Sequence, residues 1–403
     1  MSKEDFTVNS RHLPFMERLL EGEEVEWKRL GEICSKISSG KNKEKFSQGL
    51  YPVYGSTGII GRTDTKNFST HSILVARVGA NAGYVHIAKG EYDVSDNTLI
   101  IHNYDTVSFK YLYYYLVNIR LNRFAKGAGQ PLITGKLLKE VLIPIPCPEN
   151  PEKSLYIQQK IVRILDTFTE LTAELTAELT ARKNQYAYYR EELLRFEEGE
   201  VEWKALGEAG VFQRGKRFVK SDMISEGVPC IHYGEMYTHY DTWAVETRSF
   251  LNKELVEKKK LRIAEKGDVV IVAAGETIED IGKGTAWRGD EGVVIHDACF
   301  SYKSPLNPQF VAYFTRTRQF HDQIRKYISS GKISAINSKG LSKVVIPIPP
   351  PEEQERIVSI LDNFDKLTTS ITEGLPREIT LRQKQYEYYR DLLLTFPKDQ
   401  VNT

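Results

Sequence analysis

One short stretch of the sequence combines residue types that could perform covalent chemistry. His296, Asp297 and Cys299 lie together in the segment HDAC. A histidine beside a cysteine can activate a thiolate nucleophile, and a carboxylate can orient the imidazole. A local cluster of this kind is more often part of a packed strand, and we interpret it in that way. We interpret His232 as a loop or core residue rather than as a metal ligand.

Motifs that would bind a nucleotide or a methyl donor are missing. The sequence contains no GxxxxGK[ST] phosphate loop. The Gly-Lys-Gly at 282–284 lacks the full dinucleotide fingerprint and its strand-then-helix setting. The Asn/Asp-Pro-Pro-Tyr/Phe stretch expected of an amino-methylating enzyme is absent as well. We therefore expect no catalytic residue, no metal site and no cofactor in this chain.

Loops rich in glycine and in polar or basic residues indicate binding instead. Lys and Arg in such loops can contact phosphates, and Arg, Asn and Gln can contact base edges. A single charged loop is usually only solvated surface, so the inference rests on the whole set. The candidate DNA contacts are Lys41, Asn42, Lys43, Tyr54, Ser56, Arg77, Asn81, Lys126 and Gln130 in the first half, and Arg214, Lys216, Arg217, Glu276, Lys332 and Ser334 in the second.

Charge is segregated along the chain, although the total is nearly balanced. The net charge of the 403 residues is +1. Residues 28–150 contain 16 Lys and Arg against 9 Asp and Glu, and residues 204–350 contain 22 against 17. The remaining segments therefore have a net charge of −11. Two basic blocks that alternate with acidic segments indicate two different kinds of partner.

The composition is that of a globular protein with two or three domains, since 41% of the residues are hydrophobic and 27% are charged. No run of 18 apolar residues could span a membrane, and the N-terminus lacks the apolar core of a signal peptide. The four cysteines are far apart, which argues against a disulfide framework and against a zinc site. We expect a cytoplasmic protein with no membrane partner.

Long internal repeats organise the sequence. VEWKRLGE at 25–32 recurs as VEWKALGE at 201–208. Each repeat consists of a variable basic block, an IPIP junction that sets a helix start, and an acidic helical segment. Joined end to end, the two repeats would close into a ring, which predicts a pseudo-twofold protein with its termini close together. The other matching segments are 141–153 with 344–356, 161–172 with 357–368, and 182–196 with 382–396.

Apolar residues in the acidic segments recur at the alternating three- and four-residue spacing of a coiled-coil seam. We expect the seams at 161–175 and 357–371 to pack against each other in antiparallel orientation. The alternative is an exposed amphipathic helix with no spacer role. Gly374 and Pro376 should interrupt the second helix, whereas the first should be continuous. The spacer residues are Leu171, Leu175, Leu179, Leu367 and Ile371.

The basic blocks share a plan beneath divergent sequences. Each has strand-like runs, such as 72–79 and 267–275, and an aromatic helix, at 109–124 and 308–324, that we assign mainly to the core. The predicted fold class is α+β, with two strand-rich domains separated by two long helical regions. The predicted segments are 1–27, which completes the second helical region, 28–150 and 204–350, which are the strand-rich domains, and 151–203 and 351–403, which are the helical spacers.

These segments together resemble the specificity (S, HsdS) subunits of type I restriction–modification systems, over essentially the whole chain. The closest likeness is to the subgroup whose central spacer contains TAEL repeats, found here at 172–179. The segments that carry the resemblance are LGE, IPIPCPENPEKS, IVRILDTFTELTAELTAEL, KNQYAYYR and ITEGLPREITLRQKQYEYYRDLLLTFP.

The resemblance implies a non-catalytic subunit that selects the DNA target. Two target-recognition domains would each read one half of a split sequence in double-stranded DNA. The helical regions would set the gap between the halves and dock two methyltransferase (M) subunits, and restriction (R) subunits would complete the complex. S-adenosylmethionine, ATP and Mg would belong to those partners and not to this chain.

Two other functions stay open at this point. A coiled-coil scaffold whose two α+β blocks bind protein or carbohydrate would show no steep salt dependence on duplex DNA. An autonomous nuclease or methylase is disfavoured by the missing motifs. Such an enzyme would require metal- or cofactor-dependent activity of the chain alone.

Adding or deleting one TAEL unit should change the unread gap by one or two base pairs and leave both half-site sequences unchanged. One unit adds roughly 6 Å and about 40° beyond a full helical turn, against ~34 Å and about 10 bp for one turn of DNA. Methylation mapping of the variant measures both quantities. Altered half-sites would contradict the prediction.

Overall fold

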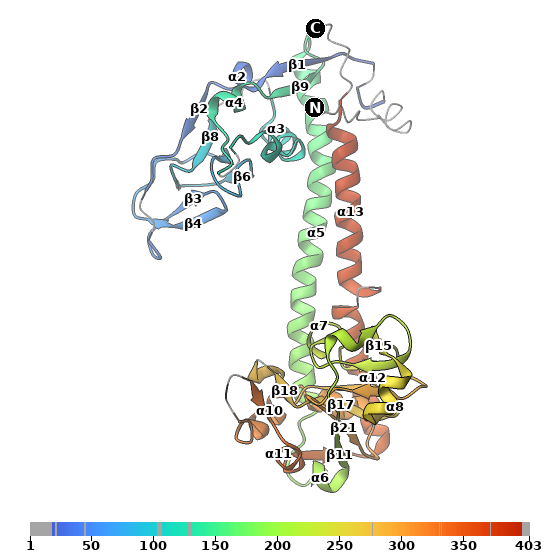
Figure 1. Ribbon diagram of the computed structural model, residues 1–403. Coiled ribbons are helices and arrows are strands. Elements are labelled where there is room, and N and C mark those ends of the chain that lie inside the picture. The colour runs from blue at the N-terminus through green and yellow to red at the C-terminus, as the bar shows by residue number, and fades with distance from the viewer. Residues whose placement is uncertain are drawn as a thin grey trace. The chain divides into compact units, whose positions relative to one another are not determined.

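The computed structural model describes residues 18–20, 22–43, 46–102, 107–127, 130–275, 277–329, 331, 333–370 and 372–396 (Figure 1). The chain forms two compact units, which we describe separately. Unit 1 comprises Met1–Leu175 and Glu378–Thr403, and unit 2 comprises Thr176–Arg377. The boundary passes through the helix α5 (Pro151–Leu193), so each unit contains part of it. The segment boundaries predicted from the sequence stay predictions, and the predicted closeness of the termini falls outside the described residues.

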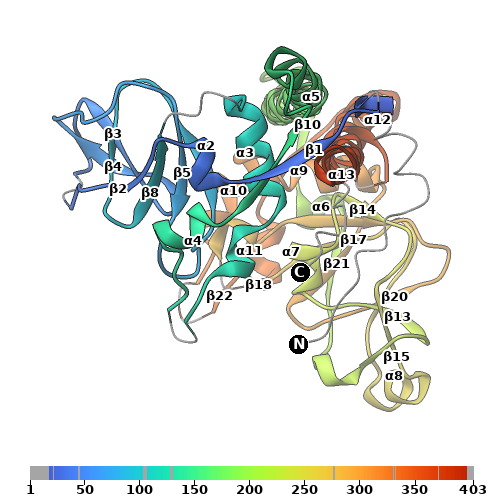
Figure 2. The same cartoon turned by 90° about the horizontal axis from the view of Figure 1, so that it is seen from above.

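Unit 1 is built on a four-stranded antiparallel sheet in the order β2-β8-β5-β6 (Figure 2). Its central strand β5 is buried on both faces. Ile73 and Val75 face the main core, whereas Leu74 faces the small sheet β4-β3-β7. The strands are β2 (Lys36–Ser39), β3 (Tyr51–Gly55), β4 (Gly58–Thr63), β5 (Ser72–Ala76), β6 (Val85–Ala88), β7 (Asp93–Val94) and β8 (Thr98–His102).

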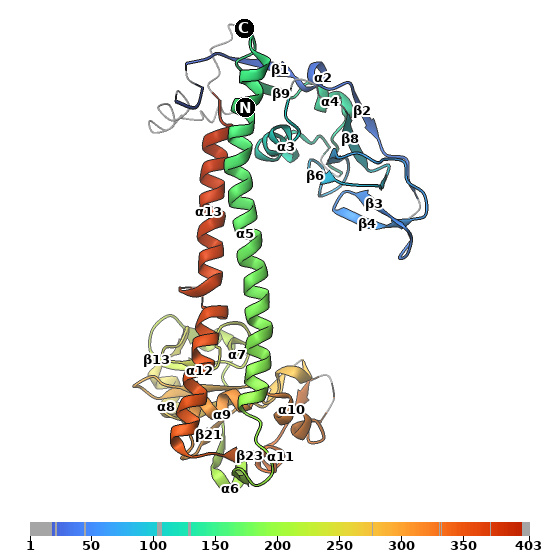
Figure 3. The ribbon, with the colours of Figure 1, turned by 180° about the vertical axis from the view of Figure 1, so that it is seen from behind.

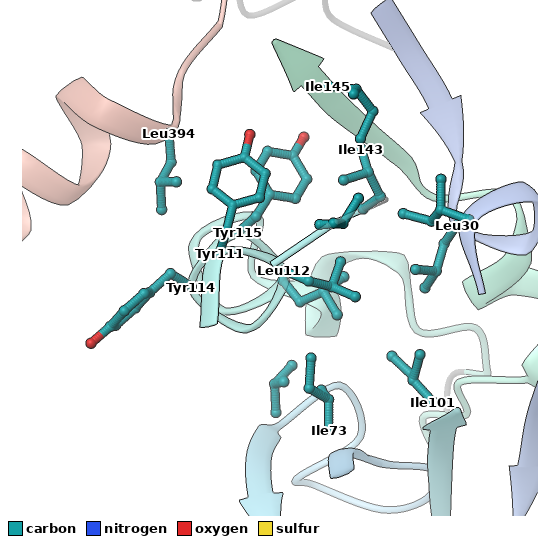
Figure 4. Close-up of a cluster of buried hydrophobic side chains, with 14 of the residues drawn as sticks. Leu30, Ile73, Ile101, Tyr111, Leu112, Tyr114, Tyr115, Ile143, Ile145 and Leu394 are labelled. Carbon is teal, nitrogen blue, oxygen red and sulfur yellow. The ribbon is translucent and has the colours of Figure 1, made fainter. Parts of the chain in front are cut away.

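The aromatic helix α3 (Phe109–Asn118) fills the main core of unit 1. Figure 4 shows Tyr111, Leu112 and Tyr115 among the aliphatic side chains of that core. The core role predicted for this segment is confirmed, but its helix is shorter than predicted. Arg120 adopts a left-handed backbone conformation with φ of 51°, which ends the helix before the 3-10 turn η1 (Leu121–Phe124).

The IPIP junction forms a strand, a role that the sequence analysis did not assign to it. β9 (Leu142–Pro146) pairs antiparallel with β1 (Val25–Arg29), so that Trp27 lies opposite Pro144. Proline is tolerated because each strand of a two-stranded ladder has a free edge. The recurrent VEWK segment therefore has a structural role as the partner of IPIP. The short helices α2 (Leu30–Ile33) and α4 (Gly135–Lys139) flank this ladder in the sequence.

Unit 2 repeats this plan with a more elaborate sheet system. The core sheet has the order β11-β21-β17-β19-β14, a second sheet has the order β12-β15-β13-β20-β16, and β18 pairs with β22. The ladder β10-β23 repeats β1-β9. The strands are β10 (Glu202–Ala205), β11 (Val211–Arg214), β12 (Met223–Ile224), β13 (Val228–Ile231), β14 (Trp243–Ala244), β15 (Ser249–Leu251), β16 (Ile263–Ala264), β17 (Val269–Val272), β18 (Ala274–Gly275), β19 (Gly284–Trp287), β20 (Val293–Ile295), β21 (Cys299–Lys303), β22 (Ser334–Ala335) and β23 (Val345–Ile348).

The aromatic segment of unit 2 is also core, but it is divided into α9 and α10. Phe310, Tyr313, Phe314 and Phe320 are fully buried there. The helices of unit 2 are α6 (Leu206–Ala209), α7 (Glu235–Thr238), α8 (Lys253–Lys259), α9 (Pro308–Phe314), α10 (Arg318–Arg325), α11 (Ser338–Ser342), α12 (Pro351–Thr369) and the start of α13 (Gly374–Leu394), with 3-10 turns η2 (Lys220–Asp222) and η3 (Ile278–Asp280).

Equivalent hydrogen bonds attach the first long helix of each repeat to its strand-rich domain. In unit 1, the backbone amide of Ser108 donates to Gln158 Oε1 over 2.7 Å, and the Tyr114 hydroxyl donates to Asp166 over 2.7 Å. In unit 2, Asn307 donates to Gln354 over 2.9 Å and Tyr313 donates to Asp362 over 2.6 Å. The internal repeat is thus preserved in side-chain contacts.

The phenylalanine of each seam packs against a Tyr-rich segment of the other repeat. This segment is 382–396 in unit 1 and 182–196 in unit 2. In unit 1, Phe168 of α5 stacks on Tyr389 of α13, with 5.2 Å between ring centroids. In unit 2, Phe364 of α12 stacks on Tyr189 of α5 over 5.5 Å. For these two phenylalanines, the prediction that one seam packs against the other is wrong. The Tyr-rich segment lies opposite each of them because the paired helices run antiparallel (Figure 3).

The contrast between the two helical regions is confirmed. α5 is one helix of 43 residues, whereas α12 ends at Thr369 and α13 begins at Gly374. Gly374 has φ of 75°, a conformation that glycine adopts without strain. Among the spacer residues, Leu171, Leu175, Leu179 and Leu367 are half-buried, and Ile371 lies outside the described residues.

Truncation of the helix anchors Leu165 and Leu361 to alanine should destabilise unit 1 and unit 2, respectively. Both side chains are fully buried at equivalent positions of the repeat, and each loss should be about 2–5 kcal/mol of unfolding free energy. Hydrogen exchange in rising urea monitors each unit separately. The half-buried Leu171→Ala is the control. Equal loosening of both units by Leu165→Ala would contradict the prediction.

Candidate nucleic-acid interface

The antiparallel register gathers the candidate loops of unit 1 at one end of the four-stranded sheet. Ser39 lies opposite Leu99, Ala76 opposite Thr98, and the last residues of β5 opposite the start of β6. The loops that follow β2 and β5 and precede β8 and β6 therefore meet at the same edge. Strand register could not be predicted from the sequence, so only the structure shows that these loops meet.

A tight backbone crossing fixes the Gly-Lys loop at this edge. The Gly40 amide donates to the Thr98 carbonyl over 2.9 Å, and the Asn42 amide donates to the Val94 carbonyl over 3.0 Å. A Cβ on Gly40 would overlap the carbonyl oxygens of Val94 and Ser95. Only glycine permits this approach, which places the exposed Lys41 immediately after the crossing.

Unit 2 contains the same crossing at the equivalent edge of its core sheet. The Gly215 amide donates to the Cys299 carbonyl over 2.9 Å, and a Cβ on Gly215 would overlap the carbonyl oxygens of Ile295 and His296. Lys216 follows this glycine as Lys41 follows Gly40. The structure thus confirms a shared scaffold beneath divergent sequences.

Residues beside a second Gly-rich stretch of each sequence repeat, at 125–130 and at 329–332, reach the same edge. In unit 1, Leu132 bridges to both Val78 and Lys126. In unit 2, Ala335 bridges to Ser329 and pairs with Ala274. Leu132 and Ala335 thereby pair with residues just beyond the ends of β5 and β17, respectively.

The predicted contacts differ in their exposure. Ser334 of β22 is only 5% exposed, because it pairs with Gly275 of β18. It is therefore removed from the set of DNA contacts. Glu276 and Lys332 lie outside the described residues. The predicted contacts that are half-buried are Asn42, Tyr54, Ser56, Arg77 and Lys216, and those that are exposed are Lys41, Lys43, Asn81, Lys126, Gln130, Arg214 and Arg217.

The turn that the Gly-Lys loop crosses was not among the predicted contacts. Ser95, Asp96 and Asn97 line a polar pocket of about 270 Å³ together with Asn42 and Lys43. The corresponding turn of unit 2 is His296–Ala298, and the Nε of Arg214 donates to the Asp297 carbonyl there over 2.9 Å. The signal was available, since both turns follow a buried strand and contain an aspartate.

His296 and Cys299 of the His-Asp-Cys segment are buried inside their domain. The rings of His296 and His232 lie 4.5 Å apart, and Phe218 packs on both. Burial lowers the pKa of His232 to about 4 and is also the main cause of the lowered pKa of His296. Burial raises the pKa of the Cys299 thiol, which disfavours a thiolate nucleophile.

Within the described ranges, no group of three or more His, Cys, Asp and Glu side chains is arranged to hold a metal ion. The helices in that part of the chain are all too short or too polar to cross a membrane.

Comparison with known proteins identifies the family. The profile of the type I restriction modification DNA specificity domain matches the chain twice, at residues 22–182 and 198–381. This chain belongs to that family. The two matches correspond to the two sequence repeats, so the predicted resemblance to type I specificity subunits is confirmed. The likeness to the subgroup with TAEL repeats stays a prediction.

Relatives align with this chain over nearly their whole length. The specificity subunit of the Escherichia coli type I restriction enzyme EcoR124I/EcoR124II is 37% identical over 421 aligned positions, which cover 96% of this chain and 98% of the relative. The specificity subunit of the E. coli type I restriction enzyme EcoprrI is 30% identical, with coverage of 90% and 92%.

Solved structures support the fold. The specificity subunit of a type I restriction-modification system from M. genitalium matches with a TM-score of 0.53 at 16% identity, covering 93% of this chain and 97% of that one. A chain from a structural study of type I complex assembly and conformational transition matches with a TM-score of 0.60 at 16% identity, with coverage of 92% and 97%.

Gly40→Ala and Gly215→Ala should each loosen the crossing in their own unit and increase hydrogen exchange around residues 94–98 or 295–299, respectively. The added Cβ cannot fit against backbone oxygens without a shift of the loop. Gly331→Ala is a matched control, because its Cβ would meet only the Ile333 carbonyl oxygen, at 3.6 Å. Unchanged exchange in both glycine variants would show that the crossing is not a constraint.

Proposed function

We propose that each strand-rich domain of this specificity subunit reads one half of a bipartite double-stranded DNA target. The observation that carries the proposal is the pair of equivalent sheet edges. They share the Gly-Lys crossing but differ in the residues around it, such as Asn42 against Arg217. A common scaffold with different side chains is what two readers of different sequences require.

Electrostatics support DNA as the ligand of these edges. Lys41, Lys43 and Lys126 are exposed in unit 1, and Arg214 and Arg217 are exposed in unit 2. Cations at such positions bind phosphates and release counterions, so affinity falls as the salt concentration rises. The scaffold alternative predicts no such dependence.

The helical regions would hold the domains at a fixed spacing and dock two methyltransferase subunits, with restriction subunits joining the assembled complex. The acidic charge of these regions suits protein partners better than DNA. The TAEL units fall within the uninterrupted helix α5, so an added unit would lengthen it without breaking its hydrogen bonds. In this proposal S-adenosylmethionine, ATP and Mg act in the partner subunits, and this chain is not an enzyme.

Co-expression with the cognate methyltransferase subunit, followed by mapping of methylated adenines in single-molecule sequencing, tests the proposal. We expect a split motif with two short specified halves around a fixed gap. A continuous motif would exclude the two-domain reading. Absence of methylation from a complex shown to assemble would favour the scaffold alternative.

Salt dependence provides a second test. The affinity of the assembled complex for its target duplex should fall by roughly 10³–10⁵ between 50 mM and 200 mM salt if six to ten phosphates are contacted. Fluorescence anisotropy on a labelled duplex measures this slope. A flat salt response would contradict recognition through the basic edges.

A further inference from the structure

The two domains offer an internal comparison that separates shared tasks from individual ones. A residue that is identical at equivalent positions serves a task that both domains perform. A residue that differs on an identical backbone serves a task in which the domains differ. If the proposed function holds, contact with phosphates is shared, whereas recognition of bases is individual.

The residue after the central strand lies in the same backbone frame in both domains. The Arg77 amide donates to the Asn97 carbonyl over 2.9 Å, and its carbonyl accepts from the Ile133 amide over 2.8 Å. The Ala273 amide donates to the Ala298 carbonyl over 2.7 Å, and its carbonyl accepts from the Ile336 amide over 2.8 Å. Both positions are therefore fixed by hydrogen bonds on each side.

The side chains in this shared frame differ completely. Unit 1 places Arg77 next to the exposed Asn97, whereas unit 2 has alanines at both positions. By contrast, Lys41 and Lys216 are the same residue after the same crossing glycine. At equivalent positions, the two domains thus share one lysine and differ at two other residues.

Arg77 is also incompletely satisfied within the protein. Its side chain is half-buried, and its Nε has no hydrogen-bond partner in the described part of the chain. A guanidinium donor that is withdrawn from water without an acceptor favours a ligand that supplies one. The guanidinium is a rigid fork that matches the paired O6 and N7 acceptors of guanine in the major groove.

We propose that Arg77 reads a guanine in the half-site of the first domain, and that Lys41 and Lys216 contact phosphates in equivalent positions of both domains. The assignment rests on the proposed function. Because Ala273 has no donor in its side chain, base recognition by the second domain must come from other residues, and the exposed Arg217 is available for it.

The test uses the assembled complex and duplexes in which each base pair of the mapped target is substituted singly. In the wild type, one guanine of one half-site should be discriminated from the other bases by roughly 5- to 150-fold. Arg77→Ala should abolish discrimination at that guanine alone. Arg77→Gln should shift the preference there toward adenine, since Gln pairs with adenine N6 and N7.

Two controls keep the outcome interpretable. Lys41→Ala should weaken binding to all duplexes equally and lower the salt slope by about 1, without changing the preferred sequence. The second half-site reports folding and assembly of the Arg77 variants within the same molecule, because its recognition should stay intact.

Three results would overturn the assignment. One is a first half-site without guanine, and another is discrimination that Arg77→Ala leaves unchanged. The third is a uniform loss of affinity with a reduced salt slope, which would place Arg77 on a phosphate. Failure of the proposed function is distinguishable from these, since the wild-type complex would then give no bipartite target at all.

Discussion

Neither repeat of this protein completes its own hydrophobic core. The core of unit 1 includes Leu393, Leu394 and Phe396 from the C-terminal end of the described chain. The core of unit 2 includes Leu194, which directly follows α5. Exchange of these segments lets Phe168 stack on Tyr389 and Phe364 on Tyr189. The sequence repeat and the folded unit therefore comprise different residues. The register of both helix pairs depends on this exchange.

Equivalent contacts in the two units attach strand-rich domains of different sequence to their helices. The attachment includes the ladder of VEWK with IPIP and the hydrogen bonds that Gln158 and Gln354 accept, which are equivalent in the two units. These equivalent contacts do not involve the end of the sheet at which Arg77 and Ala273 lie. Side chains such as Arg77 or Ala273 can change there while the backbone frame stays constant.

Much of this architecture could be predicted from the sequence, because it follows from repeats and periodic patterns that extend over many residues. The repeats, the interruption at Gly374 and the core role of the aromatic helices follow from periodicity and proline or glycine chemistry. Contacts made by single atoms could not be predicted. The Gly40 and Gly215 crossings depend on strand register, and the burial of Ser334 depends on the pairing of a two-residue strand.

The discontinuity of unit 1 has a consequence for biosynthesis. Unit 2 is a continuous segment, Thr176–Arg377, and its residues leave the ribosome together. Unit 1 begins at the N-terminus but needs residues beyond Glu378 to close its core. Unit 1 is therefore translated first but is the last to finish folding. During synthesis, part of its apolar surface stays exposed until α13 has been translated.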